Sequence, residues 1–299
     1  SGLPGSSGES QPLDLMEFSD RHLQWFRAAS QSLKESTLQV RSLRRNAAGP
    51  SEVSLQSAAT DGARVELHSR PHDRSGRPPL LYVNGVLTGK EKASAQGQKL
   101  ADQLGRDVTL VHNATALRGP GLRNLTEGAL KDSAQLVADQ AGVGHNPAVD
   151  SLKEALGKRL DQDSKPIELV GFSQGAQISA RALREVREDR VQAATDRGMP
   201  KQKAEQMVDK EISERVSFLN VSGAAQRSDF PLALKNYHQI SIKGDPVSQL
   251  LGEQSGGYDR REFARRGLKL PGLMLKNLAK HDFSKVLEQN GQSLIDFKA

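Results

Sequence analysis

Residues 167–183, which read IELVGFSQGAQISARAL, decide the fold of this chain. The apolar, β-favouring run Ile167–Val170 ends at Gly171, and a series of helix formers begins just after Gly175. This order predicts a strand, a sharp turn and a helix. Between the two glycines stands Ser173, in the pattern Gly-x-Ser-x-Gly.

The setting of Ser173 indicates a chemical role, although the five-residue pattern alone is short enough to arise by chance. A serine on a strained strand-to-helix turn needs glycines two residues to either side, because Cβ atoms there would clash with the strand and the helix. The following helix directs N–H groups and its positive dipole end at the oxyanion formed in acyl transfer. The context predicts that Ser173 is a nucleophile. The alternative is an ordinary loop of small residues.

A serine nucleophile requires a general base, because its hydroxyl is weakly nucleophilic at its own pKa. Two of the seven histidines, His238 and His281, follow Ser173. His238 begins a predicted strand and precedes the best acid candidate, so we interpret it as structural. His281 lies between two helical stretches, at the place in the chain order where this kind of triad needs its base.

The acid of such a triad is predicted at Asp245. It follows the predicted strand Gln239–Ile242, and an aspartate just beyond the carboxyl end of a strand projects into the active-site edge of an open sheet. There it can fix the histidine tautomer and stabilise the imidazolium. Gly-Asp-Pro is also good turn chemistry, which is the alternative. Asp229 is the second acid candidate.

Two backbone N–H groups are predicted to stabilise the oxyanion. One belongs to Gln174, directly after the serine, and the other to Val86, in the loop after the predicted strand Leu80–Val83. Gly85 allows the backbone to approach closely. Asn84 is a turn former whose side chain has no assigned role.

The rest of the chain alternates between strand and helix patterns, which predicts an α/β fold with a mainly parallel sheet and helices on both faces. Further strands are expected near residues 108–111 and 218–221, and helices near 93–104, 123–160, 174–189 and 200–215. The last of these carries Met207, Val208 and Ile212 on one side and is expected to be a surface helix.

The region before the core is predicted in two parts. Residues 1–12 are rich in Gly, Ser and Pro and are expected to be a disordered linker. Residues 13–75 are expected to form an amphipathic helix and three antiparallel edge strands, at 38–40, 52–55 and 63–67. Residues 76–299 then form the core.

These motifs resemble the α/β-hydrolase superfamily, especially its lipases and esterases. The resemblance covers about residues 78–290, and its motifs are Tyr82-Val83-Asn84-Gly85, Gly171-Phe172-Ser173-Gln174-Gly175, Gly244-Asp245-Pro246-Val247 and His281-Asp282-Phe283. It implies the fold, ester chemistry and a triad without cofactor or metal. Two departures are Asn-Gly where many members have His-Gly, and Phe172 where a histidine often precedes the serine.

The composition of the chain limits the kinds of site and the cellular location that we expect for it. The chain has no cysteine, which excludes disulfides and cysteine-based sites, and its net charge of +6 arises from 42 basic and 36 acidic residues. No signal sequence and no apolar stretch of about 20 residues is visible, so we expect a cytoplasmic protein, or one exported without a cleavable signal, that is not transmembrane. The leader also resembles those of bacterial effector or toxin lipases in composition.

The segment 251–280 bears on the substrate, because it interleaves basic with apolar residues. It is either a helix that packs on the sheet, which we favour, or a lid that lies at an anionic membrane surface. Nucleic acid is not expected as a partner, because the charge is weak and aromatics are not interleaved with it. The function predicted is a lipase, phospholipase or carboxylesterase. A thioesterase or peptidase would use the same triad, and the alternative is a non-catalytic binding protein on this scaffold.

Overall fold

The computed structural model describes residues 61–85, 88–114, 145–162, 164–252 and 281–291. In this part of the chain a six-stranded sheet has the order β1-β3-β2-β4-β5-β6. All neighbouring strands are parallel except β1, which is antiparallel to β3 at the edge. The strands are β1 (Arg64–Leu67), β2 (Leu80–Val83), β3 (Val108–Val111), β4 (Ile167–Phe172), β5 (Val216–Val221) and β6 (Asn236–Ile240).

The mixed α/β class and the mostly parallel sheet are as predicted, and β1 is the edge strand expected at 63–67. The other N-terminal predictions, the linker, the helix and the strands at 38–40 and 52–55, lie outside the described residues. So does the first half of the helical stretch expected at 123–160.

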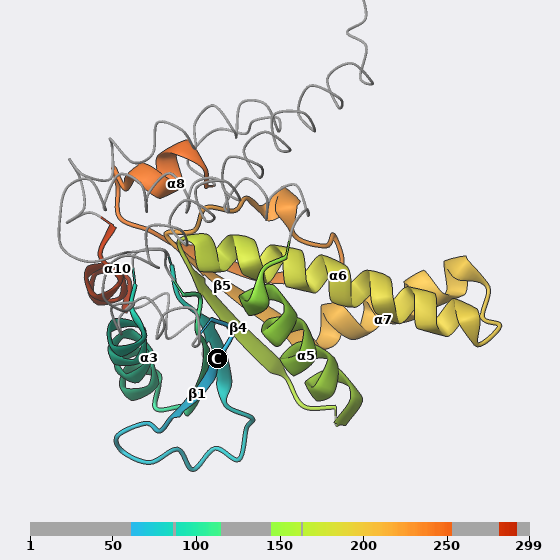
Figure 1. The fold of residues 1–299 in the computed structure, drawn as a ribbon, viewed down its shortest axis with the longest axis horizontal. Helices are drawn as coiled ribbons and strands as arrows, with labels where there is room; N and C mark the ends of the chain where they lie inside the picture. Colours follow the sequence, from blue (N-terminus) through green and yellow to red (C-terminus); the bar gives the residue numbers. More distant parts are fainter. Residues whose placement is uncertain (1–60, 86–87, 115–144, 163, 253–280, 292–299) are drawn as a thin grey trace, which may run out of the picture. The chain divides into compact units, whose positions relative to one another are not determined.

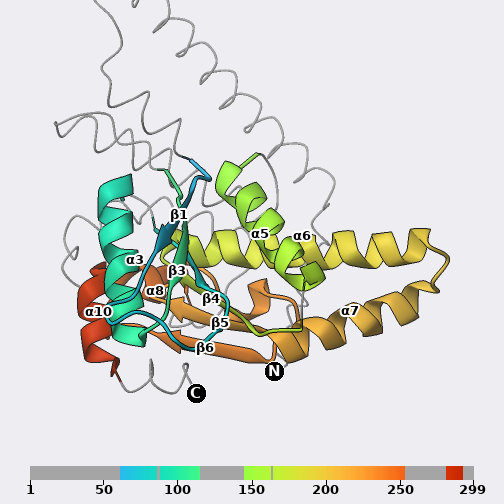
Figure 2. The ribbon, with the colours of Figure 1, turned by 90° about the horizontal axis from the view of Figure 1, so that it is seen from below.

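Helices cover both faces of the sheet (Figures 1 and 2). Alternate residues of β2 show the two cores: Leu81 and Val83 pack with α5, α6 and α7, whereas Leu80 and Tyr82 pack with α3 and α10. Burial on both faces explains why these strands are continuously apolar. The helices are α3 (Lys90–Leu104), α5 (Pro147–Gln162), α6 (Gln174–Asp196), α7 (Lys201–Arg215) and α10 (Phe283–Gln289), with a short α8 (Pro246–Leu250) beyond β6.

Three elements differ from their predicted form. Strand β4 continues through Gly171 to Phe172, because Gly171 still pairs with β2 and β5. Strand β6 begins at Asn236 and ends at Ile240, two residues short of the predicted end. Helix α7 buries Ala204, Val208 and Ile212, which recur every four residues, and so leaves Met207 44% exposed.

The chain changes direction across the sheet between β2 and β4. From β2 it moves to β3 on one side, and then returns past β2 to β4, β5 and β6 on the other. In open α/β sheets such a reversal leaves a crevice at the carboxyl ends of the two strands, where ligands bind. The fold thus places Asn84 and Gly85, after β2, beside Ser173, after β4. None of the helices described combines the length and apolar character needed to cross a membrane.

Candidate active site

Ser173 sits on a strained turn between β4 and α6. Its φ of 56° and ψ of −121° are unusual for a residue with a side chain, and such conformations cost on the order of 1–3 kcal/mol. Its N–H donates to the Val221 carbonyl at 3.1 Å, and its own carbonyl accepts from the N–H groups of Ala176 and Ala224 at 3.1 and 3.0 Å. These bonds from β5 and α6 hold the strained conformation in place.

Glycines line this turn where no Cβ atom fits. A Cβ on Gly171 would lie 2.7 Å from backbone atoms in the first turn of α6. On Gly175 it would lie 2.1 Å from the carbonyl oxygen of Val83, and on Gly85 it would lie 2.6 Å from Cβ of Ser173. The loop after β2 therefore lies directly against the serine.

Asp245 and His281 are paired although 36 residues separate them. Nδ1 of His281 lies 2.9 and 3.0 Å from the two carboxylate oxygens of Asp245. Asp245 is fully buried at the N-terminus of α8, where its Oδ1 accepts from the N–H groups of Val247 and Ser248 at 2.9 and 3.1 Å. The two backbone donors orient the carboxylate, and the carboxylate holds the imidazole so that Nδ1 carries a proton and Nε2 is an acceptor.

A face of the His281 ring contacts the residue that precedes Ser173. The ring stacks on this residue, Phe172, with 4.9 Å between centroids and 20° between planes. Nε2 is buried and makes no hydrogen bond with any described residue, the Ser173 hydroxyl included. Native proteins rarely leave a buried polar atom unpaired outside functional sites. Catalytic hydrogen bonds are often long in unliganded enzymes and tighten when substrate binds.

Ser173, Asp245 and His281, together with Asn84, Asn113 and Gln174, are called the carboxyl-edge site below. All six are less than 9% exposed. Sequence reasoning singled out every member except Asn113. The available signal was its position two residues beyond β3, at the same sheet edge as the ends of β2 and β4.

The remaining site predictions fall elsewhere. The second acid candidate, Asp229, caps a short 3-10 turn by accepting from the N–H of Gln226 at 2.7 Å, and it is not the partner of His281. His238 lies in edge strand β6 with an exposed side chain. Val86 lies outside the described residues, as does the segment 251–280 apart from Leu251 and Gly252.

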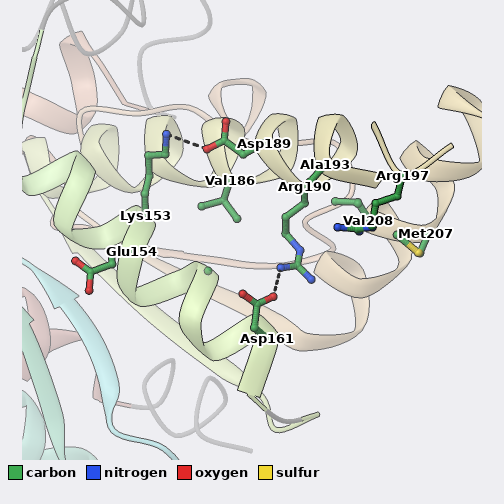
Figure 3. Close-up of a pocket in the computed structure, with 11 residues that line it drawn as sticks. Lys153, Glu154, Asp161, Val186, Asp189, Arg190, Ala193, Arg197, Met207 and Val208 are labelled. Atoms are coloured by element: carbon green, nitrogen blue, oxygen red, sulfur yellow. Dashed lines mark hydrogen bonds and ion pairs between the residues drawn. The ribbon is translucent and has the colours of Figure 1, made fainter. Parts of the chain in front are cut away.

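A second polar cluster lies among α5, α6 and α7, around a hollow of about 480 Å³ (Figure 3). Lys153 of α5 pairs with Glu185 and Asp189 of α6 at 2.9 and 3.1 Å. Arg190 of α6 pairs with Asp161 of α5 at 2.6 Å and with Glu211 of α7 at 2.9 Å. This cluster, called the helix-layer hollow, shares no residue with the carboxyl-edge site, and its ion pairs join the three helices.

Within the described ranges, no three histidine, aspartate or glutamate side chains gather in a way that could hold a metal ion. A scan against models of protein families gives no match, and a comparison with curated proteins finds no relative.

Proposed function

We propose that this protein is a serine hydrolase of the α/β-hydrolase type that cleaves carboxylic esters through Ser173, His281 and Asp245. The observation that carries the proposal is the buried Asp245–His281 pair. The ring of His281 stacks on Phe172, the residue that precedes the strained serine. The three groups come from separate segments, after β4, after β6 and before α10, and the His281 ring contacts the residue next to Ser173. An ordinary strand-to-helix loop would need no such convergence.

Each group has a role that its contacts support. Ser173 Oγ attacks the ester carbonyl while His281 Nε2 takes its proton, and Asp245 stabilises the imidazolium that forms. The N–H groups around the start of α6 and the loop after β2 stabilise the negative charge on the carbonyl oxygen. His281 then protonates the departing alcohol, and a water molecule activated by the same imidazole hydrolyses the acyl-enzyme.

The position of the unpaired Nε2, rather than its lack of a partner, favours catalysis over a binding protein on the same scaffold, because both amide atoms of Gln177 and the hydroxyl of Ser222 are also buried without a partner among the described residues. A buried nitrogen without a partner costs free energy of about 1–3 kcal/mol, as does the strained serine. In a catalytic site the serine hydroxyl and the reacting proton use that nitrogen.

Hydrolysis of p-nitrophenyl esters tests the proposal. We expect steady turnover by the parent protein, preceded by a burst of p-nitrophenol equal to the enzyme concentration where deacylation is slow, and no turnover by Ser173→Ala. Turnover that survives in Ser173→Ala would contradict the proposal, provided that the variant's circular dichroism matches that of the parent.

The substrate class is tested by varying the acyl length of the ester and by presenting the ester in solution or at a membrane surface. A carboxylesterase prefers acetate and butyrate esters, whereas a lipase or phospholipase gains rate on long-chain esters presented at an interface. Vesicles of anionic and of zwitterionic phospholipid separate the membrane-surface hypothesis for residues 251–280 from the packing hypothesis, because only the first predicts a faster rate on the anionic vesicles.

A further inference from the structure

We propose that Asn84 and Asn113 are positioning residues, which align the two backbone segments that stabilise the oxyanion at Ser173. The inference rests on the serine-hydrolase function proposed above. It assigns a role to two buried amides, neither of which can act as nucleophile, acid or base. What identifies them is a continuous chain of hydrogen bonds from the loop after β2, through the end of β3, to the first residue of α6.

Asn84 is completely buried and all of its side-chain bonds are to backbone. Its Oδ1 accepts from the N–H of Asn113 at 2.8 Å, and its Nδ2 donates to the carbonyl of Asn113 at 2.9 Å. The side chain thus continues the parallel pairing of β2 with β3 beyond the last residues of both strands. These two hydrogen bonds fix where the loop after β2 begins.

The second bond of Asn84 Nδ2 goes to the carbonyl of Gly85 at 3.0 Å and fixes the orientation of that carbonyl. Gly85 touches Ser173, since a Cβ on it would lie 2.6 Å from Cβ of the serine. Asn84 therefore holds the residue that lies against the nucleophile.

The side chain of Asn113 connects the end of β3 to the start of α6. Its Nδ2 donates to Oε1 of Gln174 at 3.0 Å, and both side chains are buried. Gln174 is the first residue of α6, and N–H groups in a first helical turn have no partner within the helix. The bond therefore holds the helix end that faces the developing charge at a fixed place relative to the loop after β2.

The chemistry of the three side chains suits this purpose. Amides are neutral, so they add no negative charge beside an oxyanion, which a carboxylate in the same place would do. Their hydrogen bonds are buried and hence do not exchange with solvent. Donor geometry near the reacting atoms matters steeply, because a displacement of about 1 Å can cost on the order of 100-fold in rate.

The test is a double-mutant cycle on the Asn113–Gln174 bond. Among the bonds between described residues, Asn113→Ala removes only this one, because the contacts of Asn113 with Asn84 use its backbone. Gln174→Met removes the acceptor while it retains the length of the side chain and the backbone N–H. With p-nitrophenyl butyrate as substrate, each single variant is expected to lower kcat by about 10- to 100-fold and to change KM by less than about threefold. The double variant is expected to be no slower than the slower single variant.

Gln98→Ala is the matched control. It removes a glutamine side chain in α3 that donates to the carbonyl of His68 and to Asp102, so it costs stability without touching the carboxyl edge. Its kcat is expected to equal that of the parent. A fall in kcat that merely follows a fall in melting temperature would appear in this variant as well.

The outcomes separate two failures. If the parent is active and Asn113→Ala and Gln174→Met retain its kcat, or if their losses multiply in the double variant, the positioning role is wrong and the proposed function stands. If the folded parent hydrolyses no ester at all, the proposed function fails and the positioning role fails with it. Should one variant not fold, the other removes the same bond from its opposite end.

Discussion

The carboxyl-edge site and the helix-layer hollow both collect polar side chains from several elements, but they stabilise them differently. At the carboxyl edge the groups are buried, and their partners are mainly backbone atoms and neutral amides. In the hollow the groups are partly exposed and pair with opposite charges on neighbouring helices. Partly exposed ion pairs contribute about 0–1 kcal/mol each, whereas buried polar groups are costly unless nearly every atom is bonded.

The difference favours the carboxyl-edge site over the helix-layer hollow as the place of the proposed reaction. The hollow is a cavity of a size that ligands occupy, yet it contains no nucleophile with an adjacent base. The carboxyl edge retains two features that folding alone disfavours, the strained Ser173 and the unpaired Nε2 of His281. Substitutions at the edge should therefore affect activity, and substitutions in the hollow should affect only stability.

The largest effect is expected at Asp245. Asp245→Asn keeps the size of the side chain but presents an amide to His281, which favours the wrong tautomer, and kcat is expected to fall on the order of 10⁴-fold. Asp229→Asn is the control, because its amide oxygen can still accept from the N–H of Gln226. Steady-state kinetics on p-nitrophenyl butyrate measures both. Equal rates for the two variants would remove Asp245 from the triad.

Two glycine-to-alanine substitutions, one in each region, compare how the carboxyl-edge site and the surroundings of the helix-layer hollow tolerate an added methyl group. Gly175→Ala places a Cβ 2.1 Å from a backbone oxygen of β2, so we expect a loss of about 3 kcal/mol in the free energy of unfolding and a loss of activity. Gly157→Ala, in α5 beside the hollow, meets no atom within 4 Å and should gain about 0.5–1 kcal/mol. Urea denaturation measures the two changes. If Gly175→Ala were as stable as the parent, the crowding described around Ser173 would be wrong.

A smaller effect is expected from Arg190→Gln in the hollow. The variant loses ion pairs to Asp161 and Glu211 that are partly solvent-exposed, so the unfolding free energy should fall by at most about 1 kcal/mol. Turnover of p-nitrophenyl butyrate at 25 °C should not change. A tenfold fall in kcat without a change in melting temperature would show that the hollow takes part in the reaction.

The smallest effect concerns pH. Burial raises the pKa of Glu185, but hydrogen bonds from Arg181 and Lys153 and the charges of both outweigh it, so the pKa lies below its ordinary value. A carboxylate with a lowered pKa in the folded state stabilises the protein above its unfolded pKa, near pH 4.3, and loses this contribution as the pH falls through the folded pKa. The stability difference between the parent and Glu185→Gln should hence shrink below about pH 4. A difference independent of pH would contradict the assignment.

Most of the sheet was predictable, because parallel strands buried on both faces are short apolar runs. Four of the strands carry this signal, and β4 with α6 adds the glycine pattern around Ser173. The end of β6 was not predictable, since its exposed alternate residues give no clear boundary. Met207 was placed on the same side of this helix as Val208 and Ile212, but the structure buries those two residues and leaves Met207 exposed.

Every member of the carboxyl-edge site except Asn113 was singled out from chain order and strand ends, but the contacts among the members were not predicted. The sequence could rank Asp245 above Asp229 only by position, whereas the structure distinguishes them by which one reaches His281. Asn113 escaped notice because nothing local marks it, and its role depends on bonds to residues 29 and 61 positions away.

Reaction with a fluorophosphonate tests the central claim most directly, because only an activated serine attacks phosphorus rapidly. Intact-mass analysis of the parent should show one added phosphonate, which peptide mapping should assign to Ser173. Ser173→Ala should gain no mass, and His281→Gln should react far more slowly. A folded parent that stays unmodified, or an adduct on another serine, would contradict the assignment of Ser173, His281 and Asp245 as a catalytic triad.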